Sequence, residues 1–120
     1  MTVQTVFIVE DEESFVDALT VGLAREGFRV EVARDGAEAI DRFASVKPDI
    51  VLLDAMLPKV SGVDVCRELR KKSGVPIIMV TALTDQHSRM EALENGAEEF
   101  LTKPVNRPEL LVRVRNLLKL

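Results

Sequence analysis

Five short apolar or β-branched segments alternate along this chain with five segments in which apolar residues recur at helical spacing. The strand segments are Thr5–Val9, Arg29–Ala33, Ile50–Leu53, Ile77–Thr81 and Glu99–Thr102. The third segment is apolar throughout, which is typical of a strand buried on both faces of a parallel sheet. The alternation predicts a doubly wound α/β fold, a five-stranded parallel sheet with helices on both faces and the common strand order 2-1-3-4-5.

Helices are expected over residues 14–26, 37–46, 63–72, 88–95 and 109–118. In each segment, apolar residues spaced three and four apart would face the core. The second helix would use Ala37, Ile40, Phe43 and Ala44, and the fourth would use Met90 and Leu93. At 120 residues, 47% of them hydrophobic, the sequence has the size of one domain spanning residues 1–120.

Composition excludes several classes of function. The net charge of −4 argues against direct binding of nucleic acid, because a phosphate backbone demands a basic surface. No apolar run is long enough to span a membrane, and residues 1–4 lack the basic start of a signal peptide. The single cysteine, Cys66, cannot form an internal disulfide, which fits a reducing compartment. We therefore expect a cytoplasmic location.

Residues that could take part in catalysis or binding stand at the carboxyl ends of four of the five strands. Glu10 and Asp11 follow the first, Asp54 the third and Lys103 the fifth, while Thr81 ends the fourth. In a parallel sheet these positions share the carboxyl edge, where ligands bind in open α/β folds. Three converging carboxylates would repel one another, and a hard cation such as Mg²⁺ would relieve that repulsion.

Each of these residues also has a purely structural interpretation. Asp54 could cap a turn or a helix, and the acidic run at residues 10–13 could be a solvated helix start. Thr81 could be an ordinary strand residue and Lys103 a surface charge. Their joint placement at the strand ends favours a shared site, in which a cation, a lysine and a hydroxyl surround one carboxylate. Such a site suggests phosphoryl transfer to Asp54.

Four motifs make the sequence similar to the receiver domains of two-component response regulators, over essentially its whole length. They are FIVEDE at 7–12, DIVLLDAMLP at 49–58, VTA at 80–82 and GAEEFLTKP at 96–104. The resemblance implies the doubly wound fold and a phosphoacceptor that assists its own reaction rather than an enzyme. The phosphoryl donor would be a phosphohistidine on a sensor histidine kinase or phosphotransfer protein.

The resemblance also implies a role for each matching residue. Asp54 would be the phosphoacceptor. Glu10, Asp11, Asp54 and the backbone carbonyl of Met56 would bind Mg²⁺. Thr81, Ala82 and Lys103 would bind the phosphoryl group, and a cis bond before Pro104 would aim Lys103 into the site. Thr81 would then move inward and Phe100 rotate, which remodels the surface formed by the fourth helix, fifth strand and fifth helix.

Two positions, 100 and 105, depart from the usual family pattern, and the loop at residues 59–62 is a mild variant of the usual turn. Phe100 stands where tyrosine is frequent, and we expect its inward rotamer to be more populated before phosphorylation than that of a tyrosine. Val105 stands where a bulkier phenylalanine is common. Met56 and Leu83 flank the site with apolar side chains that cannot orient water, so we expect slow self-dephosphorylation.

Other functions remain as alternatives. A phosphohydrolase with Asp54 as its nucleophile usually needs a second aspartate two residues later, where this chain has Met56. A module that works by dimerisation or protein binding without phosphorylation would not need the acidic set. Six charged residues either form a symmetric homodimer face or are an ordinary solvated surface: Glu94, Glu98, Glu99, Arg107, Arg113 and Arg115.

Overall fold

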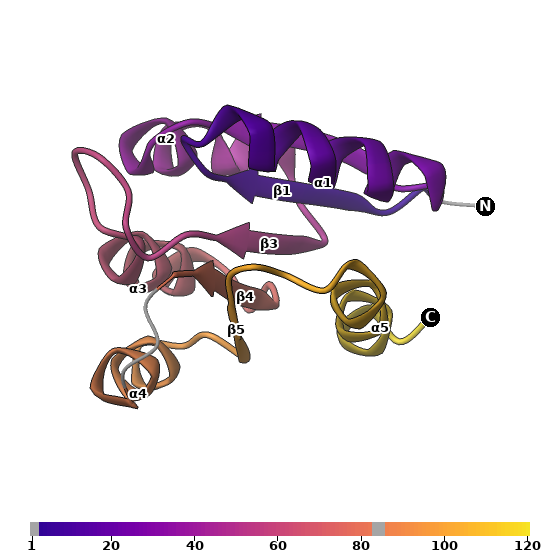
Figure 1. Ribbon diagram of the computed structural model, residues 1–120. Coiled ribbons are helices and arrows are strands. Elements are labelled where there is room, and N and C mark those ends of the chain that lie inside the picture. The colour runs from indigo at the N-terminus through magenta and orange to yellow at the C-terminus, as the bar shows by residue number, and fades with distance from the viewer. Residues whose placement is uncertain (1–2, 83–85) are drawn as a thin grey trace.

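The computed structural model describes residues 3–82 and 86–120, whose helices and strands are drawn in Figure 1. These residues contain a five-stranded parallel sheet. The strands are β1 (Thr5–Val9), β2 (Arg29–Ala33), β3 (Ile50–Leu53), β4 (Ile77–Thr81) and β5 (Glu99–Thr102). They lie in the order β2-β1-β3-β4-β5, and every neighbouring pair is parallel. This confirms the predicted fold class and strand order.

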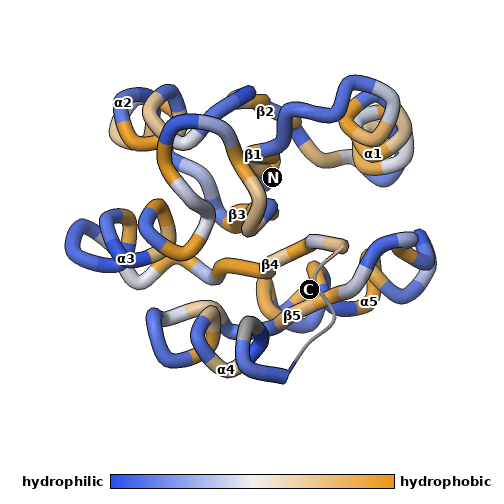
Figure 2. Tube along the Cα trace, turned by 60° about the vertical axis from the view of Figure 1, so that its left-hand side comes forward, coloured by the Kyte–Doolittle hydropathy of each residue, from blue (hydrophilic) through white to orange (hydrophobic). Residues whose placement is uncertain are grey.

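Five helices cover the two faces of the sheet. They are α1 (Glu13–Arg25), α2 (Gly36–Val46), α3 (Gly62–Lys72), α4 (Gln86–Glu94) and α5 (Arg107–Leu118). Figure 2 shows three layers, with α1 and α5 on one side of the strands and α2, α3 and α4 on the other. None of the helices in the described ranges is long and apolar enough to cross a membrane.

The hydrophobic core is divided in two by the sheet. Successive side chains of β1 point to opposite faces, as in any strand. Phe7 and Val9 pack in the cluster beneath α2, α3 and α4, whereas Val6 and Ile8 pack in the cluster beneath α1 and α5. Both clusters are aliphatic apart from a few phenylalanines, so burial of branched side chains on both faces stabilises the sheet.

The expected inward faces of two helices were partly wrong. On α4, Met90 and Leu93 are 50% and 42% exposed, and Ala92 is the residue that packs in the core. On α2, Ala39 is fully buried, whereas Ala44 is exposed. Helical spacing alone cannot fix the rotation of a helix when small and large apolar residues alternate around it.

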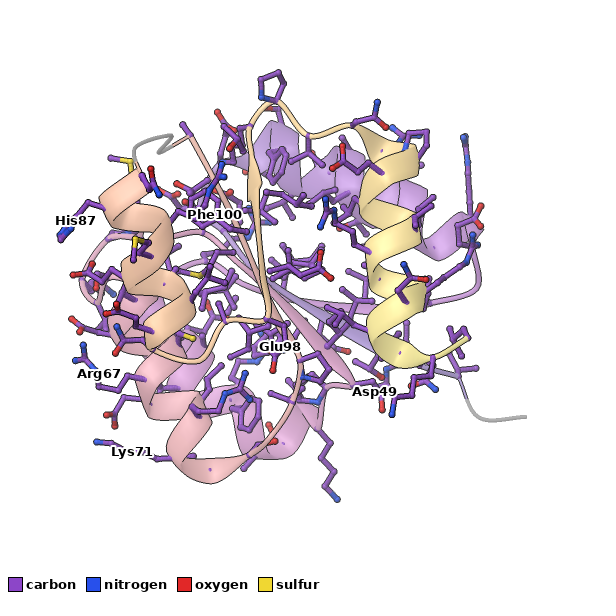
Figure 3. The ribbon with its side chains drawn as sticks, turned by 90° about the horizontal axis from the view of Figure 1, so that it is seen from below. Asp49, Arg67, Lys71, His87, Glu98 and Phe100 are labelled. Atoms are coloured by element: carbon purple, nitrogen blue, oxygen red, sulfur yellow. The ribbon has the colours of Figure 1, made fainter. Side chains whose placement is uncertain are left out.

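Arg70 connects the end of α3 to the starts of β4 and β5. Its guanidinium donates hydrogen bonds to the carbonyl of Val75 (2.6 Å), the carbonyl of Gly96 (3.2 Å) and Oε1 of Glu98 (2.9 Å). Oε1 of Glu98 also accepts a hydrogen bond from the backbone N–H of Ile77 at 2.8 Å. Arg70 therefore joins α3 to the segments that lead into β4 and β5, at the amino ends of these strands. Figure 3 labels its partner Glu98.

Candidate functional site

Asp54 is the first residue after β3, and its backbone is fixed by both neighbouring segments. Its N–H donates to the carbonyl of Val9 at 3.1 Å, which extends the pairing of β3 with β1. Its Oδ1 accepts from the N–H of Met56 at 3.0 Å. The residue is 6% exposed, so its carboxylate is largely desolvated yet lies at the edge of the sheet.

A glycine lets α3 pack directly on the Asp54 backbone. A Cβ at Gly62 would lie 2.1 Å from the Asp54 carbonyl oxygen and 2.5 Å from Cα of Ala55. The N–H of Gly62 donates to the carbonyl of Ala55 at 3.0 Å. The close approach of α3 therefore helps to set the position of Asp54 and requires a residue without a side chain at position 62.

Glu10 continues from β1 and lies beside Asp54. Its N–H donates to the carbonyl of Ala33 at 3.0 Å, and its Oε2 accepts from the N–H groups of Asp11 (3.0 Å) and Glu12 (3.1 Å). Only 2% of the residue is exposed. Burial, reinforced by the Asp54 charge, raises the pKa of Glu10 above its ordinary value, although the hydrogen bond from Lys103 opposes this shift.

Glu10, Asp11 and Asp54 form the acidic cluster predicted from the strand ends. One carboxylate oxygen from each lies within 4.8 Å of the other two, and Asp11 is exposed to solvent. The donor set consists only of carboxylate oxygens, which suits a hard divalent cation such as Mg²⁺ and not a soft metal. These residues therefore fit the implied metal, with Asp11 as the ligand most accessible to a hydrated ion.

Lys103 brings a positive charge to this cluster from β5. Its Nζ lies 2.7 Å from Glu10 Oε1, 3.5 Å from Asp54 Oδ2 and 3.7 Å from Glu12 Oε1. The Lys103–Pro104 peptide bond is cis. Burial alone would lower the pKa of Lys103, but the hydrogen bond to Glu10 and the charge of Asp54 outweigh it and raise that pKa. Lys103 therefore stays positively charged at the site.

Thr81 ends β4 and is fully buried beside the same edge of the sheet. Its carbonyl accepts a hydrogen bond from the N–H of Lys103 at 2.8 Å, which ties the ends of β4 and β5 together. Ala82 follows and is exposed. Leu83, which we expected to flank the site, lies outside the described residues.

Phe100 lies on the α4 side of β5 (Figure 3), opposite Met79 of β4 in the strand register. It is partly buried against the core cluster beneath α2, α3 and α4, and the guanidinium carbon of Arg89 lies 5.3 Å from the centre of its ring. Phe100 and Val105 also line a cavity of about 360 Å³ between α4 and α5. The expected rotamer preference of Phe100 stays a prediction.

The six residues considered for a dimer face are dispersed. Glu99 pairs with Arg113 across β5 and α5, but Glu98 pairs with Arg70 of α3. Arg115 pairs with Glu26, and Arg107 lies against Gly22, so both approach α1. Glu94 is exposed at the end of α4. The structure therefore does not gather these six side chains on one surface.

Two neighbours of Lys103 were missed in the sequence. Glu12 contributes a third carboxylate, and the ring centre of Phe15 lies 4.4 Å from the Lys103 Nζ. Both residues belong to the chain segment after β1, whereas Lys103 lies about 90 residues later, at the other side of the site. Only the packing of α1 beside the end of β5 brings them together, so no local sequence signal could have identified these contacts.

Comparisons with known proteins agree with this geometry. Residues 6–115 match the family model described as the response regulator receiver domain. The sensory transduction protein RegX3 of Mycobacterium tuberculosis is 48% identical over 115 residues, covering 96% of this chain and 51% of that protein. The DNA-binding response regulator MtrA of Mycobacterium leprae is 46% identical over 112 residues, covering 93% of this chain and 50% of that protein. The chain thus spans about half the length of these curated relatives.

Two solved structures are similar over almost the whole chain. The BeF3-activated N-terminal receiver domain of Klebsiella pneumoniae RstA is 32% identical with a TM-score of 0.93, and the match covers 98% of this chain and all of that one. The CheX-CheY-BeF3-Mg complex of Borrelia burgdorferi has a chain that is 31% identical with a TM-score of 0.89, covering 95% of this chain and 88% of that one.

Proposed function

This chain belongs to the response regulator receiver domain family, and from that premise we propose that it is a signalling switch whose phosphoacceptor is Asp54. One observation carries the proposal. The buried Asp54 carboxylate has two other carboxylates within 4.8 Å and an ammonium at 3.5 Å. A site with this balance of charge can bind a divalent cation and a phosphoryl group together.

The donor would be a phosphohistidine on a sensor histidine kinase or phosphotransfer protein. An Asp54 carboxylate oxygen attacks the phosphorus, and the new O–P bond forms as the N–P bond breaks. The departing imidazole nitrogen keeps the electron pair of the broken bond and takes up a proton from solvent, which leaves the histidine neutral. The N–H of Met56 holds Asp54 Oδ1, so Oδ2, which faces Lys103, is the oxygen left to react. Positioning of this kind accounts for much of the catalysis in phosphoryl transfer.

Glu10, Asp11, Asp54 and the Met56 carbonyl would hold Mg²⁺, which when bound neutralises charge on the phosphoryl oxygens. Lys103 would neutralise charge on the opposite side of the phosphoryl group. The Thr81 hydroxyl and the Ala82 N–H would donate hydrogen bonds to the remaining oxygens. The existing contact of Lys103 with Glu10 would then weaken, because the ammonium turns toward the negatively charged phosphoryl group on Asp54.

The output would be a change in the surface formed by α4, β5 and α5. Thr81 would move toward the phosphoryl group and Phe100 would rotate inward, so that phosphorylation shifts a two-state equilibrium. A partner protein or a second copy of the chain would read this surface. Direct contact with nucleic acid is not expected for this acidic chain.

The test is modification of Asp54. The protein would be incubated with Mg²⁺ and either acetyl phosphate or beryllofluoride, then followed by intact mass and NMR. We expect modification that EDTA abolishes, that Asp54→Asn loses, and that Asp41→Asn, an exposed site on α2, retains. Full modification of Asp54→Asn would contradict the proposal. Folded protein that binds Mg²⁺ but is never modified would instead favour the phosphorylation-independent binding module.

A further inference from the structure

The ring of Phe15 forms one wall of the Lys103 site. Phe15 lies in the first turn of α1, and its ring centre is 4.4 Å from the Lys103 Nζ. This is within the range in which an aromatic face attracts a cation. The Lys103 side chain is only 18% exposed, so water screens this attraction weakly.

Phe15 differs from the core residues of the same helix. Val16, Leu19 and Leu23 are at most 6% exposed, whereas Phe15 is only partly buried at the edge of their cluster. Part of its ring therefore faces the site and not the core. A residue needed only to fill the core would be expected to lie deeper.

A cavity lies on the Phe15 side of Lys103. It has a volume of about 540 Å³ and opens between α1 and the segment after β5. Phe15, Leu19, Lys103, Val105 and Arg107 are among its lining residues. The Lys103 side chain therefore has space to swing away from Asp54, and the Phe15 ring stands at the boundary of that space.

The three carboxylates around Lys103 do not by themselves fix the ammonium. Glu10 and Asp54 lie inside the site, but Glu12 is 61% exposed and at 3.7 Å could draw Nζ outward. An aromatic face attracts the cation without occupying any of its three N–H donors. The Phe15 ring can thus hold the Lys103 ammonium in place while the ammonium exchanges its hydrogen-bond partners.

We propose that Phe15 is a positioning residue that keeps the Lys103 ammonium facing Asp54 while its hydrogen bond passes from Glu10 to the incoming phosphoryl group. This inference rests on the proposed function of Asp54. Without the ring, Lys103 would spend more time toward Glu12 and the cavity, and fewer encounters with a phosphodonor would be productive.

Two variants distinguish the effect of the aromatic face of Phe15 from the effect of its apolar bulk. Phe15→Leu keeps an apolar side chain but removes the aromatic face, and Phe15→Tyr keeps the face. We expect the Lys103 Hε resonances, assigned by comparison with Lys103→Arg, to show an upfield ring-current shift in the wild type and Phe15→Tyr and to lose it in Phe15→Leu. This measurement needs no phosphodonor and tests the contact of the ring with Lys103, whereas the rate described next tests whether that contact positions the ammonium.

The second measurement is the rate of Asp54 phosphorylation by acetyl phosphate at saturating Mg²⁺. We expect Phe15→Leu to be slower by about fivefold, the equivalent of one cation–π contact, and Phe15→Tyr to match the wild type. Thermal unfolding would verify that both variants fold. Equal rates in Phe15→Leu and the wild type, or no ring-current shift in the wild type, would overturn this inference alone. Absence of Asp54 modification in the wild type would overturn the proposed function as well.

Discussion

The guanidinium of Arg70 lies 2.9 Å from the carboxylate of Glu98 and joins α3 to the start of β5. The same guanidinium donates to the carbonyls of Val75 and Gly96, so its loss leaves several polar groups without their partner. We expect Arg70→Ala to lower the free energy of unfolding by about 2–3 kcal/mol. Urea titration would measure this. Lys72→Ala, at an exposed site on the same helix, should change the free energy of unfolding by less than about 0.5 kcal/mol. Equal effects of the two substitutions would contradict a stabilising role for the Arg70 hydrogen bonds.

Gly62 provides a second test of the fold around the site. Gly62→Ala would place a Cβ 2.1 Å from the Asp54 carbonyl oxygen, so the start of α3 or the Asp54 backbone must shift. We expect a loss of about 1–3 kcal/mol in unfolding free energy, together with slower phosphorylation of Asp54. Gly74→Ala is the matched control, because no atom lies within 4 Å of a Cβ built there. A Gly62→Ala variant as stable as Gly74→Ala would refute the close contact.

The raised pKa of Glu10 predicts a particular dependence of stability on pH. Burial raises this pKa above the ordinary value of 4.5, so just above pH 4.5 the native state binds more protons than the unfolded state. Stability therefore falls as pH rises through this window. Glu10→Gln cannot titrate and should lack this contribution. Urea unfolding in EDTA, between pH 4.5 and neutrality, would show the variant gaining stability relative to the wild type. A constant difference across that range would rule out the shift.

Met56 is expected to make the phosphorylated state long-lived. The residue is 60% exposed, and its N–H holds Asp54 Oδ1, so its side chain lies beside the acceptor but cannot orient water. We expect Met56→Asn to shorten the half-life of phosphorylated Asp54 about tenfold. The decay would be followed by intact mass after removal of the donor. Val21→Asn places the same amide at an exposed site on α1 and should leave the half-life unchanged.

Phe100 is expected to favour its inward rotamer more than tyrosine would at the same position. An outward phenylalanine exposes more of its apolar ring to water, whereas a tyrosine in that orientation would gain hydration of its hydroxyl. NMR measurement of χ1 populations in unphosphorylated protein should therefore show a larger inward fraction for the wild type than for Phe100→Tyr. A wild-type ring that is predominantly outward would disprove this.

The strands and the acidic cluster could be predicted from sequence because each depends on local pattern and on one topological rule. The bounds of all five predicted strands match the structure. Glu10, Asp11 and Asp54 meet because residues that follow neighbouring parallel strands share an edge. Neither inference required knowledge of how any helix is rotated.

The features that could not be predicted from the sequence depend on packing between segments that are distant along the chain. Met90 and Leu93 were expected in the core, but α4 buries Ala92 instead, because the small side chain lets the helix lie close to the sheet. In the sequence, Arg70 is one of several basic residues at the end of α3, and only the structure shows that it forms an ion pair with Glu98. The contact of Phe15 with Lys103 depends similarly on the relative placement of α1 and β5.

The division of the core by the sheet has a consequence for how the sequence can vary. Val114 of α5 and Leu69 of α3 belong to separate clusters and have the sheet between them. Substitutions at such positions should be close to additive, since they share no neighbouring side chain. Each half of the interior can thus change its composition without compensation in the other half. Only the strand backbones, which carry Asp54 and Lys103 at their ends, must remain compatible with both.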